Sequence, residues 1–495
     1  MATATGKEKF TQPAGLYVLF LTEMWERFSY YGMRAILILF MTEVATKGGM
    51  ELSAPEAAAV YALYTSSVYL LSLPGGWLAD SVFGQRRTIW YGGITIMLGH
   101  IILAIPGDNV VFFCGLAVVA IGTGLLKPNI SSIVGELYPE GGSRRDAGFS
   151  IFYMGINLGG FLGQTVVAFL GEKVNWHWGF GAAAVGMFIG LVIFKFQGQK
   201  HLSQYGNEPK EKIKFSFKTI LSVIGILGAL AILLIVLHLT HVINAYSPQG
   251  LAQVMKWIII GISCLYFFYI LILGNLSLVE RKRVVVLMVL FIAAALFWSG
   301  FEQAGSSLNL FASRYVDRDF LGSWQVPAGW LQNFNQIFII IFAPLMAALW
   351  INLGRRNLNP NVPAKFALGL ILMGLGFLVM VFAAKIVVSG EKAAFTWLIM
   401  TYFLHTIGEL CLSPVGLSTY TKLAPKQFVS QMMGVWFVAA ALGNLFAGLF
   451  AGNFDKDNVQ QMPDLFMSVV YLGVGSGLFL LVFSKPIKKW MGGVE

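Results

Sequence analysis

Charged and aromatic side chains share one face of the first apolar segment. Glu23, Glu26, Arg27, Tyr31 and Arg34 fall within an arc of about 140° if the segment is a helix with 100° per residue. Glu23 and Arg27 stand at i, i+4, so carboxylate and guanidinium can exchange partners when a proton or an anion arrives. Arginine grips a carboxylate with a planar fork and keeps its proton. This face is suited to proton-coupled binding of a carboxylate.

Three more charged residues, Lys127, Glu302 and Glu409, stand inside apolar segments. Each charge costs about 2.5–3.5 kcal/mol at the centre of a membrane helix, so the whole set of seven would cost on the order of 20 kcal/mol if it faced lipid. Snorkelling to the interface explains a residue near a helix end, such as Glu23 or Arg34, but not all seven. We therefore expect them to line one polar cavity, with Glu302 and Glu409 available as partners of basic residues across it.

His405 and Glu409, four residues apart, suggest a zinc site only superficially. No third His, Cys or carboxylate accompanies them with ligand spacing, so we expect no metal. Cys114, Cys264 and Cys411 lie in separate apolar stretches and are predicted to be buried structural thiols.

The composition requires a membrane protein. The chain has 495 residues, of which 57% are hydrophobic and only 12% charged, and its mean hydropathy is +0.72. These values exclude a soluble enzyme and a disordered chain. At roughly 20 apolar residues per span, the length fits about 12 to 14 transmembrane helices. The polar start, residues 1–13, precedes a segment without a cleavage site, so we expect a first span and not a removed signal.

Fourteen apolar runs are separated by charged or Pro/Gly-rich breaks, and they predict an all-α polytopic membrane protein. The long polar break at 197–217 and a short one at 280–283 divide them into two six-helix bundles and an inserted helix pair, with domains at 1–200, 201–280 and 281–495. Gly155, Gly159 and Gly163 predict close packing of one helix against another. The runs are 15–45, 56–80, 87–106, 109–135, 147–171, 177–197, 217–241, 252–276, 284–312, 328–352, 364–388, 394–421, 428–452 and 463–485.

Basic residues are distributed unevenly between the two sides of this topology. With the N-terminus inside, 23 of the 34 basic residues fall on the cytoplasmic side and 8 on the other. This excess follows the positive-inside rule and predicts that both termini are cytoplasmic. It also accounts for the net charge of +10 without a nucleic-acid partner.

Four ordered motifs resemble those of the proton-dependent oligopeptide transporter family, also called the peptide transporter family, of the major facilitator superfamily. Residues 23–31, EMWERFSYY, are similar to E-x-x-E-R-F-x-Y-Y, and residues 75–88 are similar to the superfamily loop G-x-L-A-D-x-x-x-G-x-x-x-T. Residues 152–159, FYMGINLG, resemble F-Y-x-x-I-N-x-G, and residues 408–417, GELCLSPVGL, resemble G-E-L-x-x-S-P-x-G-L. The resemblance spans nearly the whole chain, and the inserted pair is similar to that of bacterial fourteen-helix members.

The resemblance implies a major facilitator fold and a symporter of protons with di- and tripeptides, which works by alternating access in the cytoplasmic membrane and needs no cofactor. We expect the bilayer and the peptides to be its partners and the chain to be a monomer. Implied roles are proton coupling (Glu23, Glu26, Arg27, Glu302), the peptide carboxylate (Arg27, Lys127, Tyr31, Tyr69), the peptide amino terminus (Asn157, Asn335, Glu409), side-chain pockets (Trp298, Trp436), an outer gate (Arg34 with Glu302) and an inner gate (Lys127 with Glu409).

The sequence departs from the family pattern at three places. The second span has no histidine, Phe301 stands where some bacterial members have an acid, and Ala439, Ala440 and Ala441 replace a serine-rich stretch after Trp436. Proton coupling would then rest on the first span and on Glu302, and one pocket would be less polar. Another substrate of the same family, such as nitrate or a conjugated plant metabolite, is the alternative, although the E-x-x-E-R motif weighs against nitrate. A membrane enzyme or an ion channel is the alternative outside it, although no catalytic triad, heme ligand pair or selectivity filter is present.

Overall fold

Long helices make up most of the chain. The computed structural model describes residues 12–139, 142–209, 247–320, 324–452 and 459–493, together with Gly322 and scattered positions between 225 and 244. The first half contains α1 Ala14–Thr42, η1 Ala45–Lys47, α2 Ala54–Leu70, α3 Ser72–Leu78, η2 Ala79–Phe83, α4 Gln85–Ala104, α5 Asn109–Glu136, α6 Gly142–Lys173 and α7 Trp176–His201.

The second half follows α9 Pro248–Leu273, which belongs to the segment between the halves. It contains α10 Leu278–Phe301, η3 Glu302–Gly305, α11 Ser307–Tyr315, η4 Ala328–Gln332, α12 Asn333–Arg355, α13 Val362–Val388, α14 Thr396–Leu423, η5 Lys426–Phe428, α15 Val429–Ala451, η6 Val459–Gln461, α16 Met462–Val482 and α17 Ser484–Trp490. Two small sheets complete it: β1 Val316–Asp317 pairs in parallel with β4 Ala393–Ala394, and β2 Asp319–Phe320 pairs antiparallel with β3 Trp324–Gln325.

Thirteen of the fourteen predicted spans coincide with these helices. The remaining prediction, 217–241, lies largely outside the described residues. Within the described chain, eleven helices are long and apolar enough to cross a membrane. The 29-residue helix α1 is of similar length but carries four charged residues. The chain is therefore a multi-pass membrane protein, as the composition predicted.

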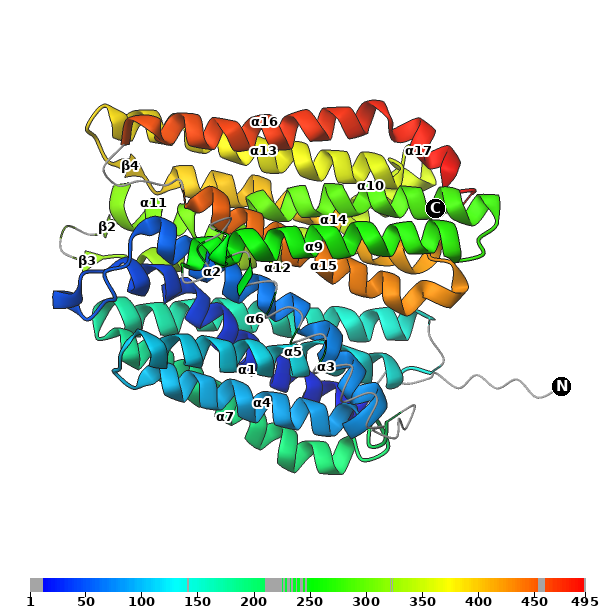
Figure 1. Ribbon diagram of the computed structural model, residues 1–495, viewed down its shortest axis with the longest axis horizontal. Coiled ribbons are helices and arrows are strands. Elements are labelled where there is room, and N and C mark those ends of the chain that lie inside the picture. The colour runs from blue at the N-terminus through cyan, green and yellow to red at the C-terminus, as the bar shows by residue number, and fades with distance from the viewer. Residues whose placement is uncertain are drawn as a thin grey trace.

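The two halves form two bundles that lie side by side (Figure 1). Helices α1 to α7 occupy the lower half of the view and α10 to α16 the upper half, while α9 runs between them and packs on α2 and α15. Both termini lie at one end of the molecule, and the small strands lie at the other. We call the end that carries the strands the distal end.

Local sequence signals set where helices begin. Ser53 and Glu56 form a capping box before α2, since each side chain binds the other's backbone N–H. Ser277 and Glu280 repeat this arrangement before α10. Gly84, with φ +80°, ends the η2 turn, and the following Arg86 donates its backbone N–H to Gly206. The loop within residues 75–88 therefore packs against the chain that leaves α7.

Helix α10 is interrupted at Glu302, one of the charged residues predicted to line the cavity. Its α-helical hydrogen bonding ends at Phe301, a 3-10 turn covers Glu302–Gly305, and α11 begins at Ser307. Ser306, between them, has φ −124° and ψ −98°, far from helical values. Glu302 thus projects from a break in the helix and not from a regular turn.

Two predicted cysteine environments are wrong. Cys411 is buried, but Cys114 and Cys264 are exposed on the helix surfaces of α5 and α9. The prediction equates an apolar segment with a buried position. A membrane helix, however, is also apolar on the side that faces lipid.

The predicted glycine stripe packs α6 against α1. A Cβ atom at Gly159 would lie 2.1 Å from the backbone oxygen of Met24, and one at Gly163 would lie 2.2 Å from that of Phe28. Because the obstructing atoms belong to the α1 backbone, no side-chain movement relieves the clash. The stripe therefore fixes the distance between α6 and the charged helix α1.

We predict that Gly159→Ala destabilises the folded protein by about 1–3 kcal/mol, since overpacking forces the backbones apart. The matched control is Gly261→Ala on α9, where a Cβ would meet no atom within 4 Å. The gain in helix propensity is the same in both variants. Thermal unfolding of the purified proteins should show a lower Tm for Gly159→Ala only, and equal Tm values would contradict the packing role.

Candidate functional site

The acidic and basic groups of α1 form one buried cluster. Arg27 Nε lies 3.0 Å from Glu23 Oε1 and forms a second, closer ion pair with Glu26. All three residues are at most 3% exposed. The guanidinium of Arg27 also lies over the rings of Tyr30 and Tyr31, with centroid distances of 5.1 and 5.9 Å. The predicted contact between Glu23 and Arg27 is therefore present.

This cluster has hydrogen-bonding capacity that the described chain does not use. Arg27 Nη2, Glu23 Oε2 and Glu26 Oε1 are buried and have no hydrogen-bond partner among the described residues. A buried charged group without such partners is costly. A ligand carboxylate at Arg27 and a proton on a glutamate would each relieve part of this cost.

Lys127 on α5 faces the same cluster. Its Nζ lies 3.8 Å from the ring centroid of Tyr69 on α2, a cation–π contact. It also interacts electrostatically with Arg27, Glu26 and Glu23. Pro128 follows it within the helix and removes one backbone N–H there. The structure thus brings Lys127 and Tyr69 next to the α1 cluster, as a shared site requires.

The second bundle contributes a smaller polar group from α12 and α14. Asn335 donates from Nδ2 to Thr406 Oγ1 at 2.9 Å and to Glu409 Oε2 at 3.5 Å. Glu409 is 9% exposed and Asn157, on α6 of the first bundle, is 2% exposed. Among the described residues no ion pair joins Glu409 to Lys127, the second cross-bundle pair that was expected.

The two selected tryptophans have different surroundings. Trp298 on α10 is partly exposed, and its indole N–H is buried without a hydrogen-bond partner in the described chain. Trp436 on α15 is 6% exposed and packs edge-on against Phe366 and Tyr420. Trp298 thus has a free donor to offer a ligand, whereas Trp436 is largely enclosed by other rings.

Arg34 and Glu302 join the bundles toward the distal end. The guanidinium of Arg34 forms an ion pair with Glu302 through Nη2 and donates from Nε to the hydroxyl of Tyr61. Gly305 admits that hydroxyl, because a Cβ there would lie 1.8 Å from it. Nearby, Asn309 donates to the backbone oxygen of Ala35 at 2.7 Å. The first of the two expected cross-bundle ion pairs is therefore formed.

A second polar connection lies closer to the distal surface. Glu172, at the end of α6, accepts the backbone N–H groups of Ala328 at 2.7 Å and Gly329 at 2.9 Å. Its Oε2 also lies 3.7 Å from Nη1 of Arg318, and both side chains are about nine-tenths buried. Arg318 itself donates to Val326 and Ser313 backbone oxygens, within the second bundle. We call Arg318 and the two amides the socket of Glu172.

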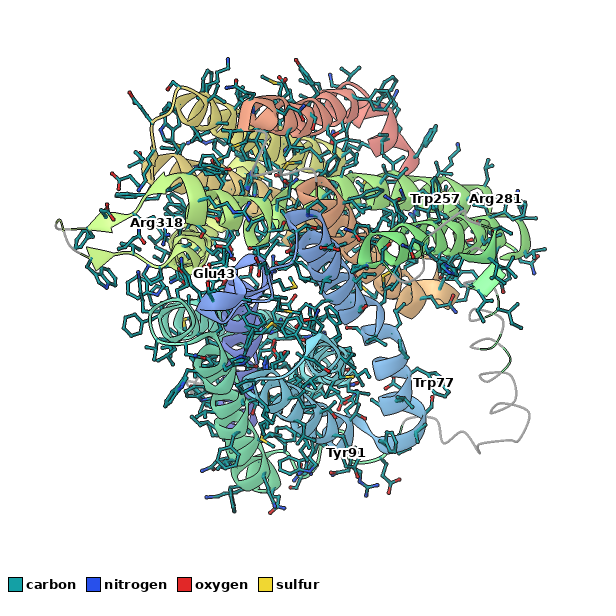
Figure 2. All side chains as sticks on the ribbon, turned by 60° about the vertical axis from the view of Figure 1, so that its left-hand side comes forward. Glu43, Trp77, Tyr91, Trp257, Arg281 and Arg318 are labelled. Atoms are coloured by element: carbon teal, nitrogen blue, oxygen red, sulfur yellow. The ribbon has the colours of Figure 1, made fainter. Side chains whose placement is uncertain are left out.

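The socket opens beside a polar pocket of about 510 Å³ that both bundles line. Figure 2 places Glu43, from the first bundle, and Arg318, from the second, on neighbouring elements of this region. Trp330 and Asn333 add further cross-bundle bonds to Thr165, at 2.8 and 2.9 Å. The distal end is therefore closed by polar contacts in this structure.

Tyr61, Glu172 and Arg318 do not stand out in the sequence as functional residues. An acid at a helix end and an arginine in a loop are ordinary at a membrane surface, so neither stood out as a buried charge. Two of the partners of Glu172 are backbone amides, which carry no sequence signal at all. The proline-containing start of η4, Pro327 before Ala328, was the only local hint of a helix N-terminus that could bind an anion.

Two helical bundles that enclose a charged cluster and meet over it through breakable polar contacts define a secondary transporter of the major facilitator type. Comparison with known proteins specifies the group. The PTR2 signature, described as the POT family, matches residues 86–465. The chain belongs to the POT family.

Relatives and solved structures agree along the full length. The chain is 38% identical to the peptide transporter YePEPT of Yersinia enterocolitica, with 100% of this chain and 98% of the relative covered. It is 35% identical to a di-/tripeptide transporter of Lactococcus lactis subsp. cremoris, with 99% of each covered. A crystal structure of the peptide transporter POT in complex with sulfate superposes with a TM-score of 0.89 at 41% identity, covering 97% of this chain and 96% of that one.

We predict that Glu172→Gln weakens the distal closure. The two backbone N–H groups bind different oxygens of Glu172, and in glutamine one of these becomes an uncharged NH2 that cannot accept. A hydrogen bond to a charged group contributes about 1.5–3 kcal/mol. The population with an open distal end should therefore rise roughly tenfold or more. Spin labels on cysteines at the exposed positions 174 and 319, with the three native cysteines replaced by serine, report the distance between the bundles.

Glu43→Gln is the matched control, because Glu43 lines the same pocket but contacts groups of its own bundle: Lys47 at 3.8 Å and the backbone N–H of Val44 at 3.1 Å. Its distance distribution should equal that of the unmodified chain. An unchanged distribution in Glu172→Gln would show that the Glu172 contacts do not hold the distal end closed.

Proposed function

We propose that this protein is a proton-coupled symporter of di- and tripeptides that works by alternating access. The observation that carries the proposal is the buried cluster of Glu23, Glu26 and Arg27, with its unused donors and acceptors, beside Lys127. The family and the names of the relatives, a peptide transporter and a di-/tripeptide transporter, support the substrate class. The family's established activity is transport, not catalysis.

In this proposal the peptide carboxylate binds to the first bundle, and the amino terminus lies between Asn157 of the first bundle and two residues of the second. Arg27 and Lys127 bind its carboxylate, with Tyr31 and Tyr69 beside them. Its amino terminus binds to Asn157, Asn335 and Glu409. The carboxylate of Glu409, which Asn335 holds by a hydrogen bond, accepts from the ammonium group. Trp298 and Trp436 border the side-chain pockets. A peptide of about dipeptide length then contacts both bundles and draws them together, as alternating access requires.

The proton is the proposed coupling ion, and no cofactor is needed. The seven charged residues of the spans comprise three cations and four acids. One proton on a glutamate therefore makes the empty set neutral. Moving that proton inward through about 100 mV releases about 2.3 kcal/mol, which corresponds to roughly 50-fold accumulation of a zwitterion. Glu23, Glu26 and Glu302 are the proposed proton carriers. Arg27 changes its ion-pair partner when one of these carboxylates is protonated.

The proposed orientation places both termini in the cytoplasm of the cell and the protein in the cytoplasmic membrane, as a monomer. The excess of basic residues on the side of the termini supports the orientation. The distal end is then the outer one. Arg34 with Glu302 acts as the outer gate, which is closed in this structure, and Lys127 with Glu409 acts as the inner gate.

Uptake of labelled dialanine into liposomes that hold the purified protein tests this function. With an inward proton gradient the peptide should accumulate above its external concentration, and an uncoupler should abolish the accumulation. Unlabelled dipeptides should compete. If folded protein takes up no dialanine under either condition, the substrate is another organic anion and the peptide proposal is wrong.

We predict that Glu26→Gln abolishes uphill uptake but retains exchange of labelled for unlabelled peptide, because glutamine is permanently neutral and cannot release a proton. Glu43→Gln, at the end of the same helix, removes a partly exposed carboxylate outside the buried cluster and should retain both activities. Accumulation and counterflow are measured in the same liposomes. Full proton-driven accumulation by Glu26→Gln would remove Glu26 from the coupling mechanism.

A further inference from the structure

An apolar groove of about 820 Å³ runs along α7 on the surface of the first bundle. Val166 and Leu170 of α6 form one wall, and Val185 and Ile189 of α7 form the other. The floor consists of Trp25 and Phe28 of α1, whose rings lie 5.3 Å apart. The groove is separate from the charged cluster, because its lining contains no charged side chain.

Two glycines of α7 create the space. Gly186 lies directly over Phe28, since a Cβ there would be 2.4 Å from the ring. Gly181 faces the groove with only Ala104 nearby, at 3.7 Å from a Cβ placed on it. Larger residues at these positions would fill the groove or displace α1. The cavity is therefore a product of particular residues and not of loose packing along the whole helix.

The groove has the length and polarity of one membrane leaflet. From Trp178 to Ile189 the helix advances about 16 Å at 1.5 Å per residue, close to half of a hydrocarbon core of about 30 Å. Its two polar lining residues, Asn175 and His177, both lie at the distal end of α7, and Trp178 beside them is 67% exposed. An interfacial tryptophan and polar groups at one end, with only apolar groups beyond, match a headgroup region followed by an acyl region.

The groove is continuous with the lipid-facing surface of the bundle. Val166 and Val185 on its rims are 40% and 58% exposed, and both lie within membrane-spanning helices. In a bilayer these side chains contact hydrocarbon. An unfilled groove between them would forfeit the dispersion contacts of its lining. The acyl chains of the surrounding bilayer are therefore the groups available to fill the groove.

We propose that this groove binds one acyl chain of a phospholipid from the distal leaflet, with the headgroup near Asn175 and His177 and the chain end against Trp25. This chain contacts the turn of α1 that carries Glu23, Glu26 and Arg27, on the side opposite to the charges. The lipid then supports the packing of that turn against α6 and α7. The proposal depends on the membrane-spanning fold and is independent of the transported substrate.

Photocrosslinking in nanodiscs tests it. The probe is a phosphatidylglycerol with a diazirine at the methyl end of one acyl chain, added to phosphatidylcholine. After photolysis, mass spectrometry of peptides maps the adducts. We expect adducts on Trp25, Phe28 and Ile189, in addition to adducts on exposed side chains of α9 such as Leu265 and Phe268, which report general lipid contact.

Gly181→Leu should reduce the adducts on Trp25 and Phe28 at least fivefold and leave those on α9 unchanged. Gly261→Leu on α9 is the matched control, because nothing lies within 4 Å of a Cβ there, and it should leave the α1 adducts unchanged. If Gly181→Leu lowers the unfolding temperature strongly, Val185→Trp closes the groove from its exposed rim. Adducts on α9 without adducts on α1, or α1 adducts that neither groove variant reduces, would overturn the proposal.

Discussion

The cost of placing charge in a membrane governs this molecule. Seven charged residues inside the spans must all be kept from lipid, so helix α1 turns its acids and arginines inward and the two bundles close around them. Arg27 is held by two carboxylates, Lys127 rests on an aromatic ring, and Arg34 finds an acid in the other bundle. Glu26 and Arg27 each keep a hydrogen-bonding atom without a partner in the described chain. This distinguishes the cluster from a purely structural network, in which every donor and acceptor would be satisfied.

The contacts between the bundles include ion pairs that the packing of α6 on α1 lacks. Within the first bundle, α6 approaches α1 to backbone distance over glycines, and no exchange of partners is available there. Between the bundles, ion pairs and hydrogen bonds to a carboxylate accompany a close contact of α15 with α2, where a Cβ at Gly448 would lie 2.7 Å from the backbone oxygen of Ala58. These ion pairs and hydrogen bonds are strong in one geometry and replaceable by water in another. Rigid halves joined by exchangeable polar contacts are the physical requirement for two alternative arrangements of one chain.

Much of this architecture could be predicted from the sequence. Helix boundaries followed from apolar length and charge breaks, and the cost of burying charge indicated that acids of the second half would meet basic residues of the first. The particular pair of Arg34 with Glu302 followed from the family resemblance, and the structure forms it. The socket of Glu172 could not be predicted, because backbone amides are invisible in a sequence and the meeting of α6 with η4 depends on how the bundles dock. The exposure of Cys114 and Cys264 was missed since hydrophobicity does not distinguish a lipid-facing side from a packed one. The cation–π contact of Lys127 with Tyr69 depends on helix rotation, which one sequence does not specify.

The interruption of α10 at Glu302 has a mechanical consequence. Because the α-helical hydrogen bonds stop at Phe301 and resume only at Ser307, α11 is joined to α10 by a hinge of five residues and not by a stiff rod. The short α11 tip can therefore tilt away from α1 while α10 stays packed on α15. Release of Glu302 from Arg34 then needs only a local bend, which can precede the movement of the whole bundle. In the proposed alternating access, the distal end would then open in steps, with the contact of Arg34 and Glu302 released before the remaining distal contacts.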